Sequence, residues 1–159
     1  MNLTFIPINE TYASAILHWH YDAPYDLYNL SPDDADEHIS EFLDPENGYY
    51  AILNEENDFL AYCCFGPDAW VPGGDYSSQA LDIGMGVRPD LTGQGQGLIY
   101  AQAVLDFGAQ TFSPTQFRVT VAQFNKRALR VWEKAGFQEK QRFQKEQTDM
   151  NFVVLARKI

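Results

Sequence analysis

The first half of this chain has no positively charged side chain. All eleven Lys and Arg residues lie at or after Arg88, whereas sixteen of the 22 Asp and Glu residues precede it. The first part therefore carries a charge of about −16 and the second part about +5. A nucleic-acid surface needs clustered Lys and Arg, so this distribution argues against such a partner. The acidic part is either a surface that attracts cations or an ordinary solvated one.

Long apolar runs and cysteine pairs are also missing. No run of about 18 apolar residues occurs, which predicts no membrane span, and the N-terminus lacks the charged and apolar regions of a signal peptide. The two cysteines, Cys63 and Cys64, are adjacent in a strand-like run and would point to opposite faces, so we expect no disulfide framework and a cytoplasmic protein. His18, His20 and His38 lack metal-ligand spacing, which predicts no metal site.

The length of 159 residues, with 45% hydrophobic residues, predicts one domain over 1–159. Periodicity and turn residues predict elements in the order βααβββαβαββ. The expected strands cover 3–8, 49–53, 59–65, 81–87, 116–122, 137–145 and 149–157. The expected helices cover 10–19, 32–43, 98–112 and 126–135, and the loop over 66–79 is long.

A glycine-rich loop joins the strand over 81–87 to the helix over 98–112. Gly93, Gly95 and Gly97 alternate there with Gln94 and Gln96. Glycines let a ligand approach the backbone, and free N–H groups at a helix N-terminus attract negative charge. The pattern therefore predicts a site for a pyrophosphate, although a plain turn remains an alternative for the loop taken alone.

Two known classes of phosphate-binding loop do not fit. A Walker loop needs Lys and then Ser or Thr after its last glycine, where this chain has Leu98 and Ile99. A dinucleotide loop needs G-x-G-x-x-G and an acid at the end of the next strand. Here the spacing is G-x-G-x-G, and Gln123 follows the strand over 116–122.

Two motifs together resemble the GNAT superfamily of acyl-CoA-dependent N-acyltransferases. The segment 87–97 reads V-R-P-D-L-T-G-Q-G-Q-G, near the family pattern V-x-P-x-x-[RQ]-G-x-G-x-[GA]. The segment 125–137 matches N-x-x-A-x-x-x-Y-x-x-x-G-F, except that Trp132 replaces the Tyr. Thr92 replaces the usual Arg or Gln. The resemblance implies an α/β (α+β) GNAT fold, with a central mixed, mostly antiparallel sheet of about seven strands flanked by about four helices.

The resemblance implies an N-acetyltransferase that moves an acetyl group from acetyl-CoA to a primary amine by direct attack in a ternary complex. The acceptor would be a small molecule, a peptide N-terminus or a lysine, and a homodimer is compatible with the sequence. The family Tyr often protonates the departing thiolate, which an indole cannot do. A CoA-binding regulatory protein with impaired catalysis is therefore the alternative. The implied cofactor-binding residues are Met85, Val87, Gly93, Gln94, Gly95, Gln96, Gly97, Leu98 and Asn125.

Asp82, at the start of the strand over 81–87, is the catalytic candidate. The resemblance implies that its carboxylate accepts the proton that an ammonium group must lose before attack; capping a turn or orienting a water is the alternative. The Gly84-Met85-Gly86 triplet indicates a bulge or a close backbone approach. The resemblance implies that this strand bulges and separates from its neighbour, leaving Met85 and Val87 to pair with the pantetheine arm.

The aromatic segment 21–30 is the candidate acceptor site. Tyr25, Asp26 and Tyr28 combine a negative charge with aromatic rings, which together can hold a cationic amine. The resemblance implies that this segment borders the acceptor site, whereas core or surface packing is the alternative. We therefore expect a cationic acceptor bound largely by the acidic part of the chain.

Overall fold

The elements follow the predicted order along the chain. The structure, a computed structural model, describes residues 2–159. The strands are β1 (Thr4–Pro7), β2 (Tyr49–Leu53), β3 (Phe59–Phe65), β4 (Leu81–Val87), β5 (Gln116–Ala122), β6 (Gln138–Gln144) and β7 (Asn151–Lys158). The α-helices are α1 (Glu10–Leu17), α2 (Ala35–Leu43), α3 (Gly97–Phe112) and α4 (Lys126–Lys134).

Local sequence signals account for most helix starts. The Asn9 side chain accepts a hydrogen bond from the backbone N–H of Tyr12 and begins α1. Ser31 caps a 3₁₀ turn, Pro32–Asp34, that leads into α2, so the first turn of the predicted second helix is 3₁₀ rather than α. Helix α1 ends at Leu17, two residues before the predicted end.

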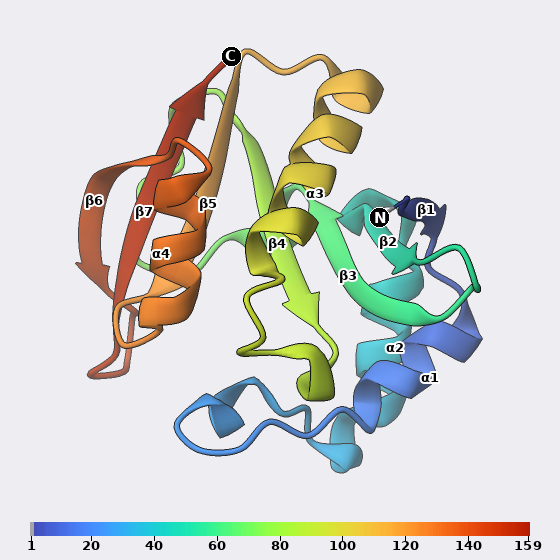
Figure 1. The fold of residues 1–159 in the computed structure, drawn as a ribbon. Helices are drawn as coiled ribbons and strands as arrows, with labels where there is room; N and C mark the ends of the chain where they lie inside the picture. The colour runs from blue at the N-terminus through green and yellow to red at the C-terminus, as the bar shows by residue number, and fades with distance from the viewer. Residues whose placement is uncertain (1) are drawn as a thin grey trace.

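The seven strands form one sheet in the order β1-β2-β3-β4-β5-β7-β6. All neighbouring pairs are antiparallel except β4 and β5, which are parallel. Helices α3 and α4 cover one face of the sheet, and α1 and α2 pack on the other face over β2 and β3 (Figure 1). This is the mixed, mostly antiparallel fold that the sequence predicts.

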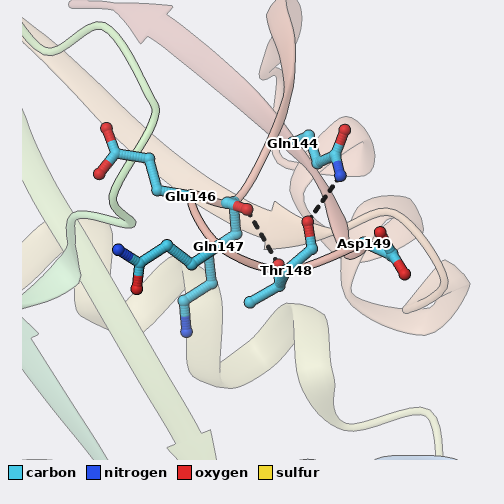
Figure 2. A pocket seen from close by; sticks show the side chains of 6 residues that line it. Gln144, Glu146, Gln147, Thr148 and Asp149 are labelled. Carbon is cyan, nitrogen blue, oxygen red and sulfur yellow. Dashed lines mark hydrogen bonds between the residues drawn. The ribbon is translucent and has the colours of Figure 1, made fainter.

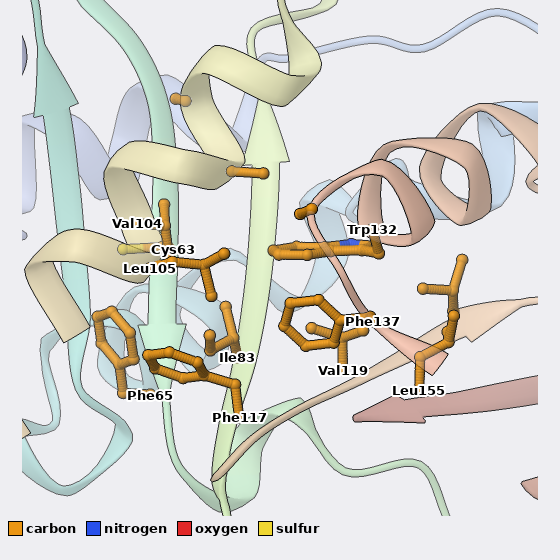
Figure 3. Packing of buried hydrophobic residues seen from close by; sticks show 14 of the residues in the cluster. Cys63, Phe65, Ile83, Val104, Leu105, Phe117, Val119, Trp132, Phe137 and Leu155 are labelled. Carbon is orange, nitrogen blue, oxygen red and sulfur yellow. The ribbon is translucent and has the colours of Figure 1, made fainter. Parts of the chain in front are cut away.

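The main core lies between the sheet and α3 and α4. Side chains that alternate along β3, β4 and β5 meet Val104 and Leu105 from α3 and Trp132 from α4 (Figure 3). Trp132 is 5% exposed, and its ring packs against Phe137 at 5.1 Å between centroids. Cys63 lies in this core and Cys64 on the other face, both as free thiols, as their adjacent positions predict.

Strands β4 and β5 pair only at their beginnings. The register runs from Leu81 opposite Phe117 to Ile83 opposite Val119, and no pairing between the two strands follows in residues 2–159. The rest of β4, 84–87, remains paired on its other edge with β3, without a shift of register. The predicted separation of β4 is therefore present, but the predicted bulge is wrong.

The glycines of β4 make room for side chains of β3. A Cβ atom at Gly86 would lie 2.5 Å from the Tyr62 ring, and one at Gly84 would lie 2.7 Å from Cys64 Sγ. The neighbours of these two glycines, rather than a bulge, therefore explain why this strand contains them.

Gly86→Ala should lower the free energy of unfolding by about 1–3 kcal/mol, because the added methyl group overlaps the Tyr62 ring. In a Tyr62→Val background the same change should cost close to nothing, and urea unfolding of the four proteins measures the difference. An equal loss of unfolding free energy in both backgrounds would show that the Tyr62 ring is not the reason for a glycine at this position.

Candidate active site at the opening between β4 and β5

The register of β4 determines which of its backbone groups face the opening. The N–H of Arg88 donates to Leu60 O at 2.9 Å, and the N–H of Gly66 donates to Asp82 O at 2.9 Å. Hydrogen-bonded pairs alternate along an antiparallel ladder, so Gly84 and Gly86 bond to β3. The N–H and C=O groups of Met85 and Val87 therefore point away from β3, to the side that β5 has left.

The glycine loop and the start of α3 form a concentration of N–H groups. Gly93 and Gly95 adopt φ values of +71° and +76°, which favour glycine. Gln96 precedes the helix without a side-chain cap, and only from Ile99 onward do the first N–H groups return to the Gln96 carbonyl. The N–H groups of Gly97 and Leu98 thus have no intrahelical acceptor. Space is open at Gly95, where an added Cβ would meet nothing within 4 Å.

Positive charge reaches this loop from α4. A Cβ at Gly93 would lie 2.9 Å from an Arg127 guanidinium nitrogen, and α4 packs close to α3 because Val131 fills the space at Gly97. The Gln94 amide donates to Asp90 O at 2.7 Å and holds the loop. Glycine backbone, free N–H groups and Arg127 together fit the phosphates of a CoA thioester.

The connection between α1 and α2 touches both sides of the opening. The Tyr21 hydroxyl donates to Val87 O at 2.6 Å, on the β4 side. On the other side, the Asn125 amide nitrogen donates to the Tyr28 hydroxyl at 3.2 Å, while its oxygen accepts from Ala128 N at 3.1 Å and caps α4. Burial raises the pKa of Tyr21 to about 12 and also raises that of Tyr28. Both hydroxyls are therefore neutral at pH 7.

The residues predicted for the acceptor are only partly brought together. Tyr25 and Tyr28 pack on Phe124 with centroids 5.9 and 6.2 Å away, and Arg127 lies 4.0 Å over the Tyr25 ring. That ring already holds a cation of the protein. Asp26 is exposed and makes no side-chain hydrogen bond or ion pair within residues 2–159. The substrate role of Tyr25, Asp26 and Tyr28 stays a prediction.

Asp82 is the acidic partner of a buried ion pair. Its carboxylate oxygens accept from Arg118 Nε at 2.6 Å and from a terminal nitrogen of Arg118 at 2.7 Å, and Trp70 Nε1 donates to Oδ2 at 2.8 Å. Asp82 and Arg118 are each 4% exposed. This pair joins β4 to β5 just before the strands separate. These three hydrogen bonds therefore occupy three of the lone pairs of the Asp82 carboxylate that could otherwise accept a proton.

Sequence reasoning missed the partners of Asp82. Arg118 lies within an otherwise apolar strand, and a buried Arg needs an acidic partner, which is the signal that could have found the pair. Trp70 stacks on Tyr76 at 5.1 Å, and the Tyr76 hydroxyl bonds Thr120 Oγ1 at 2.9 Å. The loop over 66–79 thus covers the ion pair through two aromatic rings.

Comparison with known proteins identifies the family. The family model described as an acetyltransferase (GNAT) domain matches residues 2–138. This chain belongs to the GNAT acetyltransferases. A search of curated proteins found no match.

Solved structures share the fold along nearly the whole chain at low identity. A GNAT-family acetyltransferase from Bacillus anthracis has a TM-score of 0.76 and 16% identity, over 99% of this chain and 95% of that one. Spermidine N-acetyltransferase from Vibrio cholerae in complex with CoA and spermine has a TM-score of 0.71 and 14% identity, over 98% and 95%. A dodecameric structure of that enzyme has a TM-score of 0.68 and 15% identity, over 98% and 93%.

Family membership makes the chain an N-acetyltransferase whose acyl donor is acetyl-CoA. The chain departs most clearly from the GNAT pattern at Trp132, which stands at the position of the family Tyr. Trp132 is buried in the core and presents no hydroxyl to the opening. An indole cannot deliver a proton at neutral pH, so Trp132 cannot take the role that the resemblance implies for the family Tyr.

Two surface hollows lie away from this GNAT site. One, of about 500 Å³, is lined entirely by the turn between β6 and β7, 144–149, where Gln144 donates to Thr148 O (Figure 2). The other, of about 650 Å³, lies between that turn and the start of α4 and includes Phe124 and Lys126. Neither is lined by β4 or the glycine loop.

Among residues 2–159, no helix is long and apolar enough to cross a bilayer. No group of three or more His, Cys, Asp or Glu side chains converges there in a way that could hold a metal ion.

Asp82→Asn should lower the free energy of unfolding by about 3–5 kcal/mol, because it leaves the buried Arg118 guanidinium without its counter-charge. Trp70→Phe, which removes the indole hydrogen bond and keeps a smaller aromatic ring against Tyr76, should cost about 1 kcal/mol. Urea unfolding measures both. An Asp82→Asn protein as stable as the native one would contradict a structural role for the pair.

Proposed function

We propose that this protein acetylates a primary amine, with acetyl-CoA and the acceptor bound together and the amine attacking directly. The observation that supports this most is the separation of β4 from β5, which leaves the backbone groups of Met85 and Val87 facing the opening. An extended, amide-containing arm such as pantetheine can pair with these groups as an added strand would. Acetyl-CoA supplies the activated acetyl group when bound.

The glycine loop is the proposed phosphate-binding part. The N–H groups of 93–98 and the Arg127 guanidinium would hold the pyrophosphate, and Asn125 would contact the arm from the opposite side. Tyr21 donates to Val87 O and uses one of the two lone pairs of that carbonyl, so the arm would share this oxygen with the Tyr21 hydroxyl. The connection between α1 and α2 would therefore lie directly beside the bound arm.

The base role predicted for Asp82 is tested by the turnover of folded Asp82→Asn protein. A direct base would lower kcat by roughly 10²–10⁴-fold at unchanged CoA affinity. The bonds to Arg118 and Trp70 already occupy both carboxylate oxygens, so an acceptor amine would have to compete with them. A kcat within a few-fold of native, measured where the variant remains folded, would remove Asp82 from proton transfer.

Impaired catalysis with CoA binding retained is the alternative that the sequence raised for this acetyltransferase. The buried Trp132 at the position of the family Tyr is the observation that favours it. Release of free CoA from acetyl-CoA, measured across a panel of amines, tests how far catalysis is impaired. Turnover of an amine well above the uncatalysed rate would remove this alternative. The two buried free thiols fit a reducing cytoplasm, which we propose as the location.

Gly95→Asp should abolish CoA binding, because it places a carboxylate where the phosphates would lie, in space that is otherwise open. Gly95→Asn is the matched control, since it has nearly the same shape and the same tolerance of positive φ without the charge. At 1 mM CoA and micromolar affinity, the native protein should gain about 4 kcal/mol of stability. The proposal is wrong if CoA gives the native protein no thermal shift, or if both variants bind equally.

A further inference from the structure

The face of β4 opposite α3 is covered by side chains of other elements at the point where β5 departs. Gly84 and Gly86 carry none themselves; the Tyr62 ring lies over Gly86, and Cys64 Sγ and the Ala69 methyl group lie over Gly84. The same backbone segment presents the groups of Met85 to the opening. A group that contacts the Tyr62 hydroxyl above Gly86 therefore lies beside the proposed cofactor arm, with no side chain of β4 between them.

The charge of Asp82 is not available to a ligand on this face. Its carboxylate is buried, and the Arg118 guanidinium neutralises it. The acid that remains is Asp68, in the 3₁₀ turn Pro67–Ala69, which packs against β3 and β4. Ala69 lies close beside Gly84, because a Cβ built there would be 3.7 Å from the Ala69 methyl group.

Asp68 has an accessible and uncompensated charge. It is exposed, its Oδ2 accepts from the Tyr49 hydroxyl, and it makes no ion pair with any residue of the described chain. The chain supplies no Lys or Arg before Arg88. Its Oδ1 is therefore able to accept hydrogen bonds from a cation.

The field of this carboxylate extends across the face. Burial raises the pKa of Tyr49, Tyr62 and Cys64, that of Cys64 to about 12, and is the largest cause in each case. The negative charge of Asp68 raises the pKa of all three groups further. These groups are therefore neutral at pH 7. The Tyr62 hydroxyl lies over Gly86 and has no hydrogen-bond partner among residues 2–159.

The Tyr62 ring packs among other aromatic rings of the core under α1 and α2. Tyr62 lies 6.2 Å from Tyr49, 5.9 Å from Phe42 and 5.7 Å from Trp19 between ring centroids. Rings beside a carboxylate suit an ammonium group, which gains from charge pairing and from the ring faces together. Unlike the Tyr25 ring, for which a cation–π contact with Arg127 is observed, these rings have no such contact with a Lys or Arg of residues 2–159.

We propose that Asp68, with the Tyr62 hydroxyl, binds the ammonium group of a cationic amine acceptor beside Gly84 and Gly86. This inference rests on the proposed acetyl transfer and deepens it, since it selects amines that are cationic at pH 7. Asp68 is a binding residue in this account, and its carboxylate orients the amine toward the opening between β4 and β5.

The test compares butane-1,4-diamine, which is cationic, with aniline, which is neutral at pH 7. Asp68→Asn should raise KM for the diamine about tenfold or more and leave kcat within about twofold. KM for aniline should not change, and the CoA affinity should remain native. Tyr62→Phe should raise the diamine KM by a smaller factor, and Asp68→Glu should restore part of the loss.

Asp106→Asn is the matched control, because it removes the same charge from an exposed acid of α3, which covers the other face of the sheet. Its diamine KM should stay native. The inference is overturned if Asp106→Asn reproduces the defect, if Asp26→Asn reproduces it and Asp68→Asn does not, or if both amines are affected equally. Calorimetric titration of CoA-saturated protein with the diamine measures acceptor binding independently of turnover. If the native protein does not bind the diamine in this titration, the inference is also overturned. Loss of CoA binding itself would instead contradict the proposed function.

Discussion

The separation of β4 from β5 after Ile83 is the constraint on which the site depends. A paired strand there would use the N–H and C=O groups of Met85 and Val87 internally, and no backbone would face a ligand. Because β5 instead pairs with β7 along its whole length, the sheet stays continuous while β4 keeps a free edge. The opening therefore exposes backbone groups of β4, while β3 on one side of the opening and β7 beyond β5 on the other keep the sheet continuous.

Charge is arranged around this opening in two opposed regions. Arg127 and the glycine-loop N–H groups lie at its phosphate side, whereas the acidic N-terminal part supplies the face of α1 and α2. The Asp82–Arg118 ion pair lies where β4 and β5 are still paired. Because Arg118 neutralises Asp82, this carboxylate adds no net negative charge to the opening. A CoA thioester and a cationic amine would thus be drawn to different sides of β4.

The predictable parts of this molecule are those encoded locally. The glycine-rich turn with Gly93 and Gly95 was predicted because turn geometry depends on neighbours in sequence. The partners of Asp82 were missed because they depend on the alignment of β4 with β5, 36 residues apart for Arg118. The predicted bulge at Gly84–Gly86 was wrong because the glycines instead make room for side chains of β3. These side chains are distant in sequence, so the local pattern could not indicate them. Tyr25 was placed with the acceptor, although tertiary packing brings Arg127 over its ring.

Amide hydrogen exchange along β4, with and without CoA, tests the central claim most directly. In the free protein the N–H groups of Gly84 and Gly86 should be protected by β3, whereas those of Met85 and Val87 should exchange faster. Saturating CoA should slow exchange at Met85 and Val87 and leave the glycines unchanged. Equal protection of all four amides in the free protein, or no change at Met85 and Val87 with CoA bound, would contradict the account.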